Sequence, residues 1–326
     1  MKALLCREYG SLDALRVEDV PAPVPAPGEL LIAVAAASVN FPDALMVQGK
    51  YQVKPPLPFI PGAEISGIVA AVGDGVDSSR IGKRVVAIPG RGAFAQQVAV
   101  RAETAMALDE GTDIASAAAV PLTYGTAYHA LLDRAQLKAG ETLLVLGAGG
   151  GVGIAAIELG KLMGATVIAA ASTQEKLDAA RGRGATHVIN YNTEDLRARL
   201  KEITGDKGVD VVCDPVGGAL AEPALRATGW RGRYLVIGFA AGEIPRIPLN
   251  LTLLKGSSIV GVFWGEFMRR EPRAAAGELA HLLGWLSEGS LRPLISARYP
   301  LEDAGAALTA VYERKVVGKL LITMEL

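Results

Sequence analysis

The sequence is poor in the residues that build disulfide and metal frameworks. Its 326 residues include two cysteines, Cys6 and Cys213, and three histidines, His129, His187 and His281. Two cysteines cannot form a disulfide framework or a four-thiolate zinc site, and the histidines lie far apart, without the spacing of metal ligands. We therefore expect free, buried thiols in a reducing, cytoplasmic setting and no bound metal.

The sequence also has no marked excess of positive or negative charge. The chain has 33 basic and 34 acidic residues, a net charge of −1, with Lys and Arg dispersed, so the basic face that nucleic acids require is not indicated. No run of about 18 apolar residues is free of charges or turn residues, which argues against a membrane span. The first residues, MKALLCREYG, meet a charge at Arg7 and are typical of a strand rather than a signal peptide. We expect neither a nucleic-acid partner nor a membrane partner.

The chain has two kinds of sequence pattern, one in each part. Residues 1–118 contain short β-branched runs, such as LLIAV and RVVAI, separated by Pro and Gly turns, which predicts a compact, mostly antiparallel β domain. Farther on, apolar runs alternate with amphipathic helical patterns, as in TVIAAAS followed by TQEKLDAARGRG. This alternation predicts an α/β fold of the Rossmann type, a doubly wound parallel sheet covered by helices on both faces. After about residue 256 we expect a strand SSIVGVFWG, a helix PRAAAGELAHLLGWLSEG and a final strand GKLLITM.

A glycine-rich loop joins the first of these strands to its helix in LLVLGAGGGVGIAAIELGK, at 143–161. Its best register is Ala148-x-Gly150-x-x-Gly153, with Ala where the strict dinucleotide fingerprint has Gly. Gly150 allows the backbone to approach a pyrophosphate, Gly153 allows close helix–strand packing, and the amides at the helix start point at the anion. We predict that a dinucleotide binds at Gly149, Gly150, Gly151, Val152 and Gly153; a purely structural turn is the alternative.

The end of the second strand indicates which dinucleotide binds. Folds that prefer NAD usually place Asp or Glu there to bind the ribose hydroxyls, whereas this chain has Ala171-Ser172-Thr173. Ser172, Lys176 at the start of the next helix, and Tyr191 after the third strand form a candidate clamp for a 2′-phosphate. We therefore predict NADPH rather than NADH. The alternative for Lys176 is a solvated helix residue paired with a neighbouring acid.

Several blocks together resemble one known family. They are SVNFPD at 38–43, PFIPGAE at 58–64, GKRV at 82–85, PLTYGTAY at 121–128 and the glycine loop. The sequence resembles the medium-chain dehydrogenase/reductase superfamily over essentially its whole length and, within it, the zinc-free, zeta-crystallin-like quinone oxidoreductase family. The resemblance implies a GroES-like catalytic domain of residues 1–118 and 263–326 and a Rossmann nucleotide-binding domain of residues 119–262. It also implies an active site in the cleft between them and a homodimer made by edge strands, here SSIVGVFWG.

Departures from the zinc-dependent relatives bear on the metal. Asn40 stands where they carry a zinc-binding Cys, Ala63 replaces their His, and their cysteine-rich lobe is absent. Glu64 remains, but it cannot hold zinc without thiolate or imidazole partners, so a structural role is expected for it.

Without a metal there is no Lewis acid to polarise an alcohol or a simple ketone. The substrate must then accept hydride readily by itself, as quinones and conjugated C=C bonds do, while the protein orients the cofactor. We predict an NADPH-dependent quinone oxidoreductase whose partner is a small quinone or activated alkene. An enone or enoyl-CoA reductase on the same scaffold is one alternative, and a non-catalytic NADPH-binding or RNA-binding family member is another.

Further site residues follow from the resemblance. Asn40 and Tyr51 are the catalytic candidates: Asn40 near the nicotinamide ribose or the substrate oxygen, and Tyr51 for substrate contact and proton delivery, with loop packing as its alternative. Asp43 is expected to orient Asn40 or to cap the helix that begins near Pro42. Besides Asn40, we expect Thr126 to contact the cofactor beside the phosphate and Lys319 to lie over the cofactor. Along the rim, mostly backbone contacts are expected from Val216, Gly217 and Phe239. Beside the nicotinamide or substrate we expect Phe263 and Trp264. Core or dimer packing is the alternative for Phe263 and Trp264, and an exposed surface position is the alternative for Lys319.

Overall fold

The computed structural model describes residues 1–325. The chain forms two compact units, Met1–Leu122 with Leu279–Leu326, and Thr123–Glu278. The sequence places the return to the first unit at 263, whereas that unit resumes at Leu279. The reason is local packing: Trp264 and Phe267 lie against His129, inside the second unit.

The first unit is built on a seven-stranded sheet of order β14-β15-β3-β4-β5-β7, with β6 also paired to β3. All of its pairings are antiparallel except that of β14 with β15, and β1 and β2 form a separate antiparallel pair. Leu30, Ile32 and Val34 of β3 are buried at every second position, as expected for one face of a strand. The strands are β1 (Lys2–Leu5), β2 (Arg16–Asp19), β3 (Glu29–Val39), β4 (Glu64–Val72), β5 (Arg84–Ala87), β6 (Gln97–Arg101), β7 (Ala105–Ala107), β14 (Ile295–Pro300) and β15 (Lys319–Thr323).

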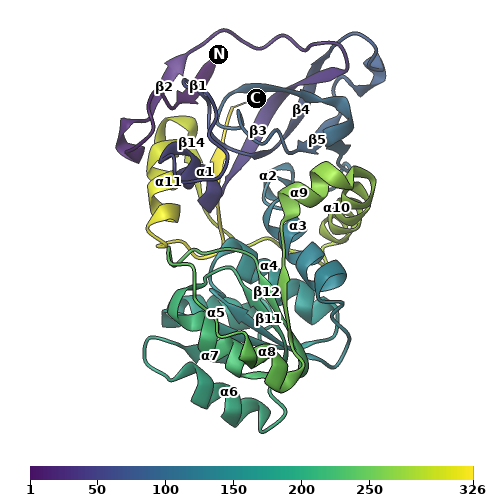
Figure 1. Cartoon of the computed structure of the whole chain (residues 1–326). Coiled ribbons are helices and arrows are strands. Elements are labelled where there is room, and N and C mark those ends of the chain that lie inside the picture. The colour runs from purple at the N-terminus through teal and green to yellow at the C-terminus, as the bar shows by residue number, and fades with distance from the viewer. Residues whose placement is uncertain (326) are drawn as a thin grey trace. The chain divides into compact units, whose positions relative to one another are not determined.

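Helices and the chain end complete this unit. The helix α1 packs against α11 (Figure 1). The last strand, β15, pairs antiparallel with β3 so that Leu320 lies opposite Val39. This register brings Lys319 next to the end of β3 and the start of α1. The helices are α1 (Phe41–Val47), α2 (Ile114–Ala117), α11 (Ala304–Tyr312) and α10 (Pro272–Ser287), which begins in the second unit, together with the 3-10 turns Leu12–Ala14, Ser78–Arg80, Ala102–Thr104 and Leu301–Asp303.

The second unit is a six-stranded, fully parallel sheet of order β10-β9-β8-β11-β12-β13. The strand order reverses between β8 and β11, which is the point where open parallel sheets bind ligands beyond the carboxyl ends of their strands. The predicted fold class is therefore confirmed. The strands are β8 (Thr142–Leu146), β9 (Thr166–Ala171), β10 (His187–Asn190), β11 (Val209–Asp214), β12 (Thr228–Val236) and β13 (Ser258–Gly261).

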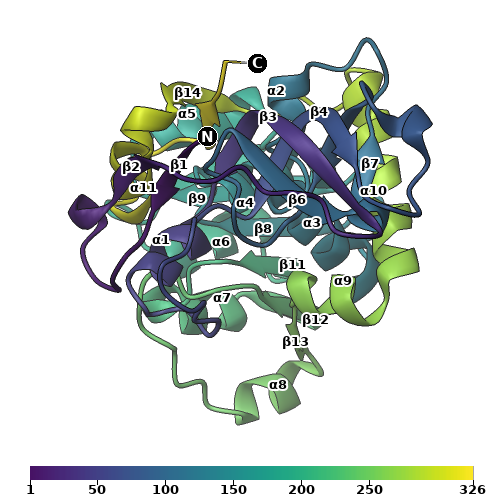
Figure 2. The same cartoon turned by 90° about the horizontal axis from the view of Figure 1, so that it is seen from above.

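Helices follow these strands as the alternation predicts. Figure 2 shows α8 at the same end of the sheet as the edge strand β13. The predicted strand SSIVGVFWG is too long, because β13 ends at Gly261 and Phe263 is already the N-cap of α9. Within residues 1–325, no helix has the length and apolarity needed to cross a membrane. The helices are α3 (Thr123–Tyr128), a π-helical turn (His129–Arg134), α4 (Gly151–Leu162), α5 (Gln174–Gly182), α6 (Leu196–Thr204), the 3-10 turn Gly218–Leu220, α7 (Ala221–Arg226), α8 (Asn250–Lys255) and α9 (Trp264–Arg270).

Candidate functional site

The glycine loop connects β8 to α4 in the second unit. Gly147 has a left-handed backbone, with φ of +60°. A Cβ at Gly153 would lie 2.4 Å from the Gly147 carbonyl oxygen, so only glycine permits this close approach of α4 to the loop. Gly150 is exposed and is the N-cap of α4. Because Gly151, Val152 and Gly153 open the helix, their N–H groups have no intrahelical acceptor; they are therefore suited to bind an anion.

A second loop, after β11, meets the glycine loop. A Cβ at Gly147 would lie 2.7 Å from Cγ2 of Val216, and a Cβ at Gly217 would lie 2.9 Å from Cδ1 of Phe239. Val216 therefore lies against the glycine loop, and Phe239 lies against Gly217. The N–H groups of Val216 and Gly217 both donate to Oδ1 of Asp214, at 2.7 and 2.8 Å, and the backbone contacts of this loop with the dinucleotide stay a prediction.

The three candidate ligands of a 2′-phosphate lie at the ends of neighbouring strands. Asn190 and Ala171 are paired residues of β10 and β9, so Tyr191 and Ser172 follow at the same edge. A Cβ at Gly149 would lie 2.4 Å from Cγ of Lys176, which places the Lys176 stem directly on the glycine loop. The ring of Tyr191 also packs on the hydrophobic core of this unit.

Asn192 also belongs to this edge and was missed by the sequence reasoning. Its Nδ2 donates to the backbone oxygen of Ser172 at 2.9 Å. The bond ties the turn after β10 to the end of β9, and a polar side chain just beyond a predicted strand was the only signal for it.

The remaining candidates of this unit differ in exposure. Thr126 is half-buried on α3, which packs against α4. Phe263 is 55% exposed, but Trp264 is only 3% exposed. The Trp264 ring packs directly on Gly125: a Cβ added at Gly125 would lie 2.7 Å from Cε2 of Trp264. Trp264 is thus a core residue that joins α9 to α3, as the packing alternative has it, and its contact with nicotinamide or substrate stays a prediction.

The first unit contains a buried polar network around Lys319. Lys319 is 4% exposed, so the surface alternative is wrong. Its ammonium donates to Oδ1 of Asn40 at 2.6 Å, to the Val39 carbonyl oxygen at 3.1 Å and to Oε1 of Glu64 at 3.3 Å. Burial lowers the pKa of Lys319, while the charges of Glu64 and Asp43 act in the opposite direction. All three ammonium hydrogens thus have protein acceptors, and the contact of Lys319 with the cofactor stays a prediction.

Asn40 is held inside the same network. Its Nδ2 donates to Oε1 of Glu64 at 2.8 Å and to the Ser38 carbonyl oxygen at 3.3 Å, and its Oδ1 accepts from Lys319. Both amide hydrogens are therefore used within the protein. The place predicted for Asn40, near the nicotinamide ribose or the substrate oxygen, stays a prediction.

Asp43 and Tyr51 lie next to this network. Oδ2 of Asp43 accepts from the backbone N–H of Asn40 at 2.8 Å, so Asp43 both caps α1 and fixes Asn40, as predicted. Burial raises the pKa of Asp43 to about 7. Burial and then the Asp43 charge raise the pKa of the half-buried Tyr51, so its phenol stays protonated and able to donate. Tyr51 also packs on the core of the first unit.

Glu64 has the structural role expected of it. Besides its bonds to Asn40 and Lys319, its Oε2 accepts from the backbone N–H of Leu122 at 2.8 Å. Within residues 1–325, no group of three or more His, Cys, Asp and Glu side chains could hold a metal ion. An amide and an ammonium beside a saturated carboxylate do not fit zinc, which takes thiolate, imidazole and carboxylate ligands.

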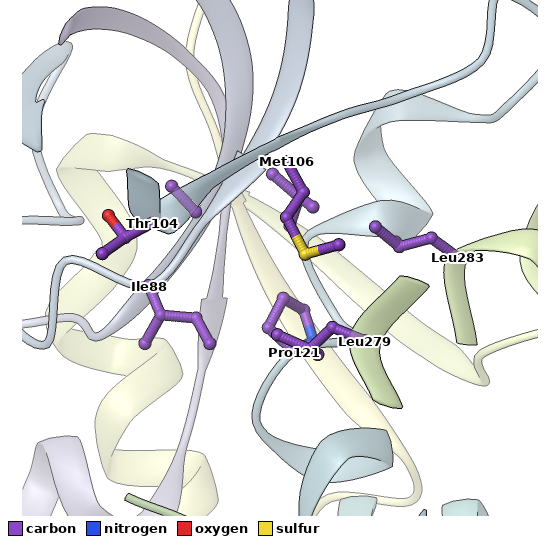
Figure 3. A pocket seen from close by; sticks show the side chains of 8 residues that line it. Ile88, Thr104, Met106, Pro121, Leu279 and Leu283 are labelled. Carbon is purple, nitrogen blue, oxygen red and sulfur yellow. The ribbon is translucent and has the colours of Figure 1, made fainter. Parts of the chain in front are cut away.

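A small cavity in the first unit lies among apolar side chains (Figure 3). Its volume of about 10 Å³ has room for one water molecule at most. Met106 points into it (Figure 3), and its lining is apolar apart from Thr104, whose hydroxyl donates to the Arg101 carbonyl oxygen at 2.8 Å. The lining residues are Val86, Ala87, Ile88, Thr104, Met106, Pro121, Leu279 and Leu283.

Comparison with known proteins agrees with this geometry. A family model described as "Alcohol dehydrogenase GroES-like domain" matches residues 26–110, and one described as "Zinc-binding dehydrogenase" matches residues 151–281. The second description names a metal that the residues around Asn40 and Glu64 do not fit.

Individual relatives cover the whole chain. The quinone oxidoreductase-like protein 2 of Rattus norvegicus is 36% identical over 326 residues, with 99% of this chain and 92% of the relative aligned. The quinone oxidoreductase of Homo sapiens is 32% identical over 329 residues, covering 99% and 98% of the two chains. The crystal structure of Escherichia coli quinone oxidoreductase complexed with NADPH superposes with a TM-score of 0.91 at 29% identity, covering 99% of this chain and 100% of that one. The chain therefore belongs to the quinone oxidoreductase, zeta-crystallin-like group of the medium-chain dehydrogenase/reductase superfamily.

Proposed function

We propose that this chain is an NADPH-dependent oxidoreductase that reduces quinones without a metal. The observation that carries the proposal is the buried Lys319 ammonium. It bonds Asn40 and Glu64 at the position where the zinc-dependent relatives bind their metal, and its three hydrogens are all taken by protein acceptors. The network offers no electrophile to a substrate oxygen, so the substrate itself must be electron-poor.

The second unit fits a dinucleotide. The free N–H groups at the start of α4 would bind the pyrophosphate, and the Lys176 stem on Gly149 would bring its ammonium toward a 2′-phosphate beside Ser172. The E. coli relative is described as complexed with NADPH, which supports the same choice here. When bound, reduced nicotinamide supplies the hydride.

The first unit supplies the groups that would act on the substrate. The Tyr51 phenol, protonated because burial raises its pKa, would donate a hydrogen bond and a proton to the reduced product. A hydroquinone anion can also take its proton from water, whereas reduction of a C=C bond needs a proton delivered to carbon. Enones and enoyl thioesters are therefore the competing substrates for the same site.

We also propose a homodimer formed through β13. This strand is at the edge of the parallel sheet, and an unpaired edge is a template for pairing with another chain. Exposed apolar side chains lie near it, including Ile259 on β13 and Leu253 and Leu254 on α8. Light scattering with Leu253→Asp tests this: the parent should have twice the mass of one chain and the variant should dissociate.

With both cysteines present as free, buried thiols, a reducing cytoplasmic location is the expected one.

The activity is tested with purified protein and a panel of acceptors. We expect NADPH oxidation with 1,4-benzoquinone, slower oxidation with a 2-alkenal or crotonyl-CoA, and none with acetone. Faster turnover of crotonyl-CoA would assign the enzyme to the enoyl thioester reductases instead. A chelator should leave the rate unchanged; a rate that falls with chelator and returns with zinc would contradict the metal-free site. If no acceptor is reduced although NADPH binds, the chain is a non-catalytic binding protein, and a salt-dependent shift of RNA would identify an RNA-binding member.

A further inference from the structure

Asp214 is a buried acid for which the proposed function has no use so far. It ends β11, and its side chain is 3% exposed. A carboxylate buried to this extent is costly unless its oxygens are hydrogen-bonded. The groups that bond it therefore indicate what it does.

Three neutral donors satisfy this carboxylate. Oδ1 accepts from the backbone N–H groups of Val216 at 2.7 Å and Gly217 at 2.8 Å, and Oδ2 accepts from the hydroxyl of Tyr234. Tyr234 is a buried residue of β12, and burial followed by the Asp214 charge raises its pKa, so it remains a donor. The Asp214 carboxylate thus ties the loop after β11 to the neighbouring strand.

The loop held in this way has a backbone conformation that favours glycine and packs closely against its neighbours. Gly217 has a left-handed backbone, with φ of +66°, and Phe239 lies directly against it. The Val216 side chain contacts the glycine loop at Gly147, and the Val216 carbonyl oxygen accepts from the N–H of Ala241 at 2.8 Å. Loss of the Asp214 bonds would leave the buried N–H of Gly217 and the half-buried N–H of Val216 without partners and free the loop that forms this side of the site.

We propose that Asp214 is a positioning residue of the nucleotide site, which holds Val216 and Gly217 in the conformation that receives NADPH without itself touching the nucleotide. This inference rests on the proposed function. A loop that is already ordered does not lose conformational freedom when the nucleotide binds, so its ordering strengthens affinity. The carboxylate also draws the two N–H groups inward, which leaves the pyrophosphate to the N–H groups at the start of α4.

The test compares Asp214→Leu with Asp214→Asn. Leucine has a similar size but no acceptor, so we expect NADPH, titrated by its fluorescence, to bind about tenfold more weakly, the equivalent of about one net hydrogen bond. Asparagine keeps an oxygen that can accept from both N–H groups, so its Kd should stay within about threefold of the parent value. Thr228→Val is the matched control: it removes a buried hydrogen bond to the Leu225 carbonyl oxygen at the other end of the same sheet and should leave NADPH binding unchanged.

Hydrogen exchange in the parent protein adds a measurement that does not depend on whether a variant folds. The proposal predicts that the Val216 and Gly217 amides are protected without nucleotide, while the amide of Gly242, which bonds the Phe239 carbonyl oxygen in an exposed turn of the same segment, exchanges faster. Fast exchange at Val216 and Gly217, or an unchanged Kd in a folded Asp214→Leu protein, would overturn the role of Asp214 alone. A parent protein that binds no nucleotide would refute the proposed function and with it the cofactor role of Asp214.

Discussion

Replacing Lys319 with methionine tests the central feature of the first unit. Methionine keeps an unbranched stem but removes the ammonium that lies 2.6 Å from Asn40 Oδ1 and 3.3 Å from Glu64 Oε1. The variant leaves Glu64, which is fully buried, without a cation. Removing one partner of a buried ion pair typically costs about 3–5 kcal/mol, because the other charge stays uncompensated. We therefore expect Lys319→Met to lower the free energy of unfolding by about that amount in urea titrations.

A second substitution separates charge from packing. In Glu64→Gln/Lys319→Met the side chain at 64 is neutral, so we expect the double variant to be more stable than Lys319→Met alone. Lys315→Met is the control, because Lys315 pairs with Glu313 on the surface, and exposed pairs contribute little. A loss of less than about 1 kcal/mol for Lys319→Met, or a double variant no more stable than Lys319→Met, would refute the view that the ammonium compensates Glu64.

Other parts of the molecule give further predictions. Lys176→Ala should weaken NADPH binding about tenfold, the effect of one charge-assisted hydrogen bond, without affecting NADH; equal Kd values for both nucleotides in the parent would contradict this. The pKa of Asp43 rises from its ordinary 3.8 to about 7 on folding, so the folded state favours the protonated acid. Stability should therefore fall between about pH 4 and about pH 7, by at most about 4 kcal/mol, and Asp43→Asn should remove this fall in urea titrations at several pH values. Gly153→Ala places a Cβ 2.4 Å from a loop carbonyl oxygen and should cost about 1–3 kcal/mol, whereas Gly277→Ala meets nothing within 4 Å in α10 and should be neutral or stabilising in thermal unfolding. Tyr51→Phe should lower kcat for a 2-alkenal more than for 1,4-benzoquinone; equal effects on both would argue against proton delivery by Tyr51.

Local sequence patterns were sufficient to predict the sheet and the glycine loop. The order of strand, glycines and helix around Gly150 and Gly153 predicts a tight turn into a helix, and the structure has this turn. Short-range sterics alone determine it. Strand ends were predicted less well. The run SSIVGVFWG is apolar throughout, and only the packing of Trp264 on Gly125 makes its last residues begin a helix.

The partners of buried polar groups could not be predicted from local pattern. Lysine is rarely buried, and Lys319 becomes so only because β15 pairs with β3 in the register that sets Leu320 opposite Val39. These segments are far apart in the sequence, and no local signal specifies their pairing. The acceptor of the Val216 and Gly217 N–H groups is likewise fixed by loop conformation rather than by residue type.

Glu64 and Asp214 show why the position of an acid in a pattern does not define its role. Glu64 begins β4 and Asp214 ends β11, and both are buried with donors on each oxygen. Glu64 has a cation among its donors, whereas Asp214 is satisfied by two amides and a phenol. A carboxylate saturated in this way does not act as a metal ligand; it acts through the groups that it holds, here Asn40 in one unit and the Val216–Gly217 loop in the other. Neither acid offers a free oxygen and Lys319 offers no free hydrogen, so under the proposed function we expect the rate to follow the electron affinity of the acceptor.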